Sequence, residues 1–79
     1  MRVTIYTPPG AHAEQMRKRT AQMMLDLGID ANIEVDSDEF DFARAGVMFT
    51  PAVSVNGTLI TNGWMPEVHD MAAAVGRRY

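Results

Sequence analysis

The strongest structural signal in this chain lies in residues 50–61, which read Thr50-Pro51-Ala52-Val53-Ser54-Val55-Asn56-Gly57-Thr58-Leu59-Ile60-Thr61. Two short segments rich in β-branched residues, 52–55 and 58–61, flank the pair Asn56-Gly57. Asparagine and glycine tolerate the positive φ angles of a two-residue turn, so this pair predicts a tight β-hairpin. The two strands are therefore expected to be antiparallel neighbours.

The segments before the hairpin alternate between strand and helix patterns. Val3 to Tyr6 is β-branched and aromatic, and it stops at Pro8-Pro9-Gly10, which cannot continue a strand. The spacing that follows predicts a helix from His12 to Leu27, ended by Gly28, with one face formed by Met16, Thr20, Met23 and Leu27. Residues 31–36 alternate apolar and polar side chains, which is typical of a strand with one wet face near a sheet edge.

Two shorter helices complete the pattern. Ser37 is expected to cap a helix that carries acidic residues at its positive end and that Gly46 closes. Pro66 suits the first position of a last helix, which ends at Gly76 and has an apolar stripe of Val68, Met71, Ala72 and Val75.

These elements predict an α/β fold in one domain over residues 1–79, with the order β-α-β-α-β-β-α. A strand–helix–strand crossover must be parallel, whereas the Asn-Gly hairpin must be antiparallel, so the four strands form a mixed sheet. We expect the first and third helices to cover one face of the sheet and the second helix to cover the other face.

Composition and charge exclude several classes of protein. A chain of 79 residues can enclose only one small core. The net charge of −3 argues against nucleic acid as a partner, because binding phosphates requires a basic face. No apolar segment approaches the ~20 residues of a membrane span, so we expect a soluble, cytoplasmic domain that does not bind a membrane. The absence of cysteine excludes disulfides and cysteine nucleophiles.

Three features together resemble the small thioredoxin-like proteins of bacteria and archaea that are described as redox-active disulfide proteins. The first strand leads through a loop into a long helix where that family places Cys-x-x-Cys, residues 55–58 resemble its hairpin, and Thr50-Pro51-Ala52 resembles its cis-proline strand start. The resemblance covers nearly the whole chain and implies a thioredoxin-like fold. It places Gly10 and Ala13 at the two cysteine positions, and neither residue is a nucleophile, so thiol–disulfide exchange does not transfer with the fold.

The resemblance also implies a binding groove beside the former motif. In the family, the residue before the cis-proline offers its backbone to an extended ligand, and Thr50 has that place here. The groove would be formed by Pro9, Gly10, His12, Phe49, Thr50 and Pro51. The alternative is that Pro51 only shapes the turn into the third strand.

A second candidate surface is apolar. Met48, Trp64 and Met65 fall in predicted loops at one end of the groove, where they would form an interaction patch with Phe49. The alternative for Trp64 is that it covers the core. We therefore predict a redox-inactive protein-binding or adaptor module that holds a protein partner or a second copy of itself. The alternative function is that of a cysteine-free protein or enzyme that binds glutathione or another small thiol.

Neither a cofactor nor a metal site is expected. His12 has no second histidine or carboxylate beside it at the spacing of metal ligands. The seven methionines would suit Cu(I), but several fall on stripes that face the core, where methionine is ordinary filler. A metal-binding relic that uses His12 and methionine is the third hypothesis.

Overall fold

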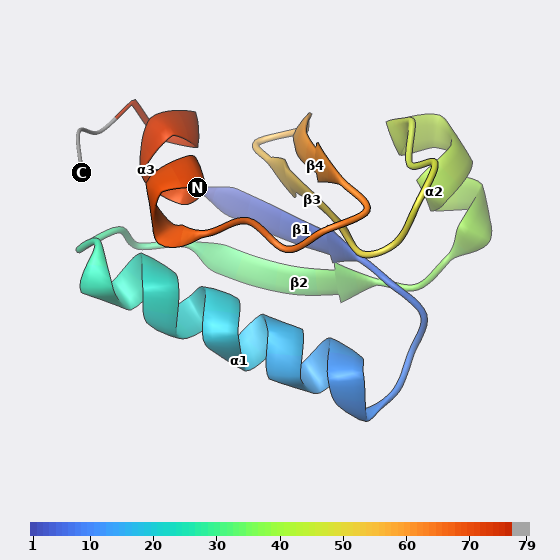
Figure 1. The fold of residues 1–79 in the computed structure, drawn as a ribbon, viewed down its shortest axis with the longest axis horizontal. Helices are drawn as coiled ribbons and strands as arrows, with labels where there is room; N and C mark the ends of the chain where they lie inside the picture. The colour runs from blue at the N-terminus through green and yellow to red at the C-terminus, as the bar shows by residue number, and fades with distance from the viewer. Residues whose placement is uncertain (77–79) are drawn as a thin grey trace.

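The computed structural model describes residues 1–76, which fold as a four-stranded sheet with three helices (Figure 1). The elements are β1 (Arg2–Tyr6), α1 (Ala11–Asp26), β2 (Asn32–Asp36), α2 (Glu39–Ala45), β3 (Ala52–Val55), β4 (Thr58–Asn62) and α3 (Val68–Ala74). This is the predicted β-α-β-α-β-β-α order of an α/β fold. The last three residues of the predicted domain, 77–79, lie outside the described residues.

The strand order in the sheet is β2-β1-β3-β4. Strand β1 runs parallel to β2 and antiparallel to β3, and β3 runs antiparallel to β4. The predicted mixed sheet is therefore confirmed, and β2 lies at an edge, as its alternating pattern indicates. Asn56 and Gly57 have φ angles of 49° and 86°, the positive values that the hairpin turn requires.

One face of the sheet carries the core. Its strands contribute fully or almost fully buried aliphatic side chains, to which α1 adds Met24 and α3 adds Met71; the strand residues are Val3, Ile5, Val53 and Val55. The predicted stripe of α1 lies on this face, where Thr20 is buried and Met16, Met23 and Leu27 are partly buried. Ala13 and Met24, which were not predicted, are also buried there. Helices α1 and α3 therefore cover the same face, as expected, and neither they nor α2 is long and apolar enough to cross a membrane.

Helix α2 covers the opposite face at one end only. Because side chains alternate along a strand, Tyr6 points to the face opposite Ile5. The rings of Tyr6 and Phe42 meet edge to face with their centroids 6.0 Å apart, and this contact places α2 on that second face. No residue of α2 is fully buried, and Phe40 is 79% exposed. The prediction of helices on both faces is confirmed.

Two predicted helix starts are wrong. The cap of α2 is Asp38, not Ser37, because the Asp38 carboxylate accepts a hydrogen bond from the Phe40 N–H at 2.9 Å. Helix α3 begins at Val68, two residues after Pro66, because the N–H of Glu67 donates to the Asp70 carboxylate at 2.9 Å and makes Glu67 the cap. Pro66 is instead buried beside the core.

Candidate binding site

The two segments that were predicted to form the groove leave the sheet at the same end. Tyr6 at the end of β1 pairs with Ala52 at the start of β3. The loop of residues 8–10 follows Tyr6, and the Thr50–Pro51 turn, whose peptide bond is cis, precedes Ala52. Of the six predicted groove residues only Pro51 is partly buried, and the other five are exposed. This end of the sheet is therefore open to solvent.

The two positions that resemble the family's cysteines carry no reactive group. Gly10 caps α1 with a φ angle of 139°, a conformation that favours glycine. Ala13 is only 6% exposed, so its methyl group belongs to the buried face of α1. Between them, His12 is exposed in the first turn of the helix. The former motif thus begins the helix without supplying a nucleophile.

Thr50 has free backbone polar groups. Within residues 1–76, neither its N–H nor its carbonyl oxygen has a hydrogen-bond partner. The neighbouring Pro51 carbonyl, in contrast, accepts a hydrogen bond from the Gly63 N–H at 2.8 Å. Backbone N–H and C=O groups are strong hydrogen-bonding groups. An exposed residue that has both of them unpaired can therefore bind an extended segment by main-chain hydrogen bonds.

Asn62 holds the loop that leads to Thr50. Its side-chain Oδ1 accepts hydrogen bonds from the N–H groups of Met48 at 2.8 Å and Phe49 at 3.1 Å. Its Nδ2 donates to the Gly46 carbonyl at 3.1 Å. Asn62 was not among the predicted site residues, and the signal that the sequence offers for it is an asparagine at the end of a strand, where asparagine is disfavoured. The Asn62 side chain therefore fixes the backbone just before Thr50.

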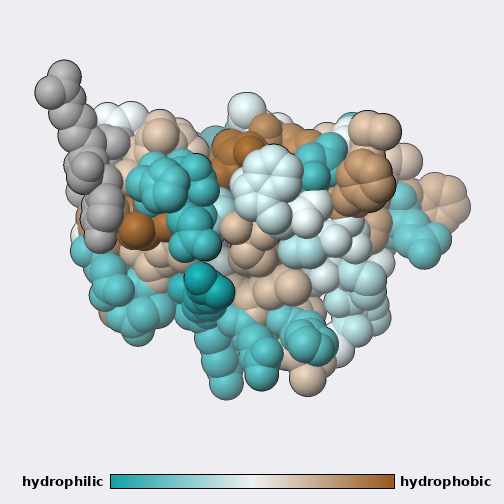
Figure 2. Space-filling model, in the orientation of Figure 1, coloured by the Kyte–Doolittle hydropathy of each residue, from teal (hydrophilic) through white to brown (hydrophobic). Residues whose placement is uncertain are grey.

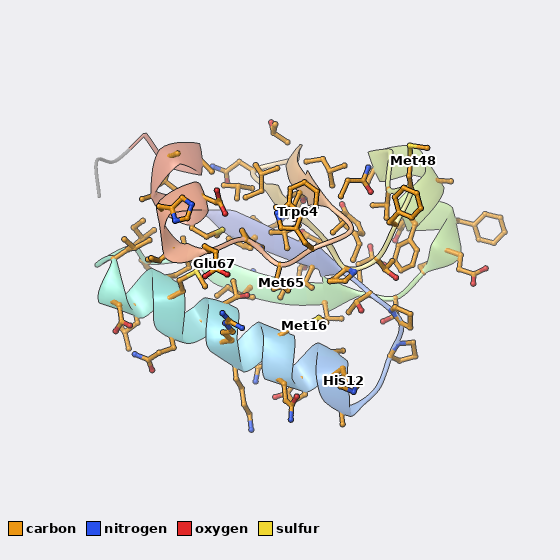
Figure 3. All side chains as sticks on the ribbon, in the orientation of Figure 1. His12, Met16, Met48, Trp64, Met65 and Glu67 are labelled. Atoms are coloured by element: carbon orange, nitrogen blue, oxygen red, sulfur yellow. The ribbon has the colours of Figure 1, made fainter. Side chains whose placement is uncertain are left out.

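The apolar patch is only partly as predicted. Met48, Phe49 and Trp64 are 76%, 66% and 57% exposed, so the side chain of Trp64 faces solvent more than it covers the core. The Phe49 Cβ lies 3.1 Å from the place that a Cβ on Gly63 would occupy, which brings Phe49 against the backbone next to Trp64. Met65 differs from the prediction, because it is partly buried and packs against the core. Figure 3 shows it beside Met16, away from Met48.

An open hollow of about 270 Å³ lies beside α1, and it is lined by His12, Gln15, Met16, Arg19 and Met65. Figure 3 shows Met65 facing Met16 across the hollow from the segment that follows β4. Of these residues, only His12 and Met65 were predicted to take part in binding, and Met16 was predicted to lie on the core-facing side of the helix. A signal for the others was present, because positions 12, 15, 16 and 19 have the spacing of one helix face. No group of three or more His, Asp or Glu side chains able to hold a metal ion occurs in the described residues.

The apolar patch and the hollow beside α1 differ in the hydropathy of the surrounding surface. Figure 2 shows a hydrophobic area over α2 and the loop after it, where Phe40, Met48 and Phe49 are exposed. Along α1 the same face is largely hydrophilic. Phe40 on α2 is thus a further exposed aromatic residue, and it was not among the residues predicted for binding.

Negative charge gathers at the end of β2. Asp36, which pairs in register with Tyr6, lies close to Asp38 and Asp41. The pKa of Asp41 is raised, chiefly by a hydrogen bond with the Asp36 side chain, and also by desolvation and by the negative charges of Asp36 and Asp38. Arg44, 3.4 Å from Asp41, opposes this shift. The ionised form of Asp41 is therefore disfavoured in the folded protein.

Replacement of Asp41 by asparagine should raise the melting temperature at neutral pH. A carboxyl group whose pKa is raised on folding destabilises the folded state above that raised pKa, and the penalty disappears below its ordinary value of 3.8. The melting temperatures of the parent and Asp41→Asn proteins should therefore differ at pH 7 and converge on acidification. Thermal unfolding followed by circular dichroism across this range checks the expectation, and a lower melting temperature for the variant at pH 7 would contradict it.

Sheet order, a cis-proline immediately before β3 and a long helix after β1 together define a thioredoxin-fold domain, here one without cysteine. Residues 1–76 match the family model described as a thioredoxin domain, and the chain belongs to this family. No curated protein and no solved structure matches the chain. The resemblance noted in the sequence is thus confirmed for the fold, while thiol–disulfide exchange lacks the thiols that it requires.

Proposed function

We propose that the chain is a redox-inactive protein-binding module that holds an extended segment of a partner protein at Thr50. The observation that carries this proposal is the free N–H and carbonyl of Thr50 beside the exposed aromatic side chain of Phe49. An extended segment can form main-chain hydrogen bonds with such a residue as if it were an added strand. Phe49 and Trp64 would then supply the apolar contacts that anchor it.

The site is held in place before any ligand arrives. The hydrogen bonds of Asn62 fix the backbone of Met48 and Phe49, and the Gly63 N–H fixes the Pro51 carbonyl. A preordered loop loses less conformational entropy when it binds, so more of the contact energy appears as affinity. This order supports a role in binding without any catalytic group.

The alternative ligand, glutathione or another small thiol, is less compatible with the charge at this end of the sheet. Glutathione carries two carboxylates, which need cationic or amide partners near Thr50. Asp36 lies instead at the same end of the sheet, since it pairs with Tyr6 while Tyr6 also pairs with Ala52. Negative charge near the groove opposes an anionic ligand, so we favour the protein segment.

The test is selection of binders from a library of random decapeptides displayed on phage, using the immobilised chain. We expect the parent protein to enrich binding peptides, and the Phe49→Ala, Trp64→Ala double variant to bind them at least about tenfold more weakly, because central aromatic anchors carry much of the energy of an interface. The matched control is Leu25→Ala, which removes a large apolar side chain that is 71% exposed on α1, outside the patch.

The small-thiol function and self-association of the chain would give different results in the same preparation. Failure to enrich any peptide, together with saturable glutathione binding in a calorimetric titration, would replace the proposal with the small-thiol function. A dimer in sedimentation equilibrium that the double variant abolishes would identify a second copy of the chain as the occupant of the patch. The cytoplasmic location remains a prediction from the sequence.

A further inference from the structure

We propose that the hollow beside α1 selects partner segments in which an apolar side chain lies two positions from an acidic one. This inference rests on the proposed function, and it names the chemistry of the partner. The apolar side chain would contact Met16 and Met65, and the carboxylate would bind Arg19.

The lining of the hollow has an apolar part and a hydrogen-bond-donating part. Met16 and Met65 form the apolar part, and both also pack against the core. Methionine side chains are flexible and polarisable, so they can adapt to an apolar ligand. His12, Gln15 and Arg19 each carry N–H donors, and no carboxylate of residues 1–76 lines the hollow. A ligand that is apolar at one end and accepts hydrogen bonds at the other matches this lining.

Of the three cationic residues of α1, Arg19 is the one that lines the hollow. Its Nη2 lies 3.9 Å from Glu67 Oε2, and the two side chains are 65% and 64% exposed. A solvent-exposed pair at that distance contributes little to stability, so an incoming carboxylate can replace Glu67. Arg17 differs, because both its Nε and Nη2 already donate to the two oxygens of Glu14. Charge complementarity therefore points to an acidic group at Arg19, although the whole chain has a net charge of −3.

The hollow is small. Its volume of about 270 Å³ is close to the lower limit of the range of roughly 300–1,000 Å³ that is usual for small-molecule sites. The hollow shares one residue with the predicted groove, because His12 belongs to both, and Met65 directly follows Trp64 in the chain. We expect one bound segment to contact both regions.

The spacing of the two contacts fits an extended chain. Met16 and Arg19 are three residues apart on α1, so their Cβ atoms are about 5–6 Å apart. Alternate side chains of a β-strand point the same way and are separated by about 6.6 Å along the strand. An apolar residue and an acidic residue at positions i and i+2 can therefore reach the methionines and Arg19 together.

The experiment compares peptides selected from the same displayed library by the parent chain and by Arg19→Glu. Parent-selected peptides should be enriched in aspartate or glutamate two positions from an aliphatic or aromatic residue, and Arg19→Glu should enrich lysine or arginine there instead. A parent-selected peptide should bind Arg19→Glu about fivefold more weakly at low salt, because an exposed charge contact is worth up to about 1 kcal/mol. Arg19→Gln should lose the acidic preference without acquiring a basic one, and Arg17→Glu, on the same helix, should retain it.

Peptides that bind the parent without an acidic preference, or whose acidic preference survives Arg19→Glu, would overturn this inference while leaving the proposed function intact. A parent chain that selects no peptide would sink the proposed function as well. Far-ultraviolet circular dichroism of each variant establishes that it is folded before the comparison is made.

Discussion

The Val53→Asp variant is expected to lose its cooperative thermal unfolding transition. Val53 has no exposed surface and lies in β3, between β1 and β4, where it packs in the same cluster as Ile5 and Met24. An unpaired buried carboxylate costs several kcal/mol even when its pKa rises to neutralise it. A domain of this length has a total stability of only about 4–12 kcal/mol, so the substitution removes most or all of it.

Circular dichroism measured against temperature checks this expectation, and Thr58→Asp is the matched control. Thr58 is an exposed residue on the adjacent strand β4, so aspartate there loses β-propensity without being buried. The control should melt cooperatively, with its midpoint lowered by a few degrees at most. If the Val53→Asp protein melts like the parent, the assignment of β3 to the centre of the sheet fails.

The elements that local chemistry determines could be predicted from the sequence. The Asn56-Gly57 turn depends on positive φ angles, a property of those two residue types, and the hairpin formed where expected. Spacing also indicated the side of α1 that faces the core, where Thr20 is buried and Met16, Met23 and Leu27 are partly buried, although it missed Ala13 and Met24. Once these elements are assigned, the right-handed crossover of the strand–helix–strand unit and the antiparallel hairpin allow few arrangements of the sheet. The fold could therefore be predicted from the elements.

Features that depend on contacts between distant segments could not be predicted in the same way. In α2, the sequence does not distinguish Phe40 from Phe42, and only the approach of Tyr6 from β1 decides that Phe42 packs while Phe40 stays exposed. Met65 follows the exposed Trp64 but turns toward Met16, which is 49 positions earlier in the chain. The spacing of positions 12, 15, 16 and 19 places four lining residues on one helix face, but it does not indicate that Met65 lies opposite them.

Without cysteine, the chain keeps the thioredoxin fold but lacks the thiols that thiol–disulfide exchange requires. The sheet of the thioredoxin domain still brings the start of α1 and the cis-proline turn to one end, whether or not a thiol is present there. That end carries Thr50, whose backbone N–H and carbonyl have no partner within residues 1–76, together with exposed aromatic side chains. It also carries a loop whose position depends on the side-chain amide of Asn62. That dependence is open to a direct test.

Replacement of Asn62 by alanine should destabilise the domain by about 2 kcal/mol, because three hydrogen bonds, each worth about 0.5–1.5 kcal/mol net, are lost together. The amides of Met48 and Phe49 should exchange hydrogen faster in the variant, since their shared acceptor is gone. The affinity for a peptide selected by the parent should also fall, because the loop before Thr50 would have to be ordered on binding. Urea unfolding, amide hydrogen exchange and peptide titration measure the three effects.

Asn62→Asp separates the two functions of this side chain. A carboxylate retains both acceptor contacts to Met48 and Phe49 but cannot donate to the Gly46 carbonyl. If the two acceptor contacts hold the site in place, the aspartate variant should protect these amides and bind the peptide better than the alanine variant, even where its stability is similarly reduced. Equal peptide affinity in the parent and both variants would mean that the order of this loop does not contribute to binding.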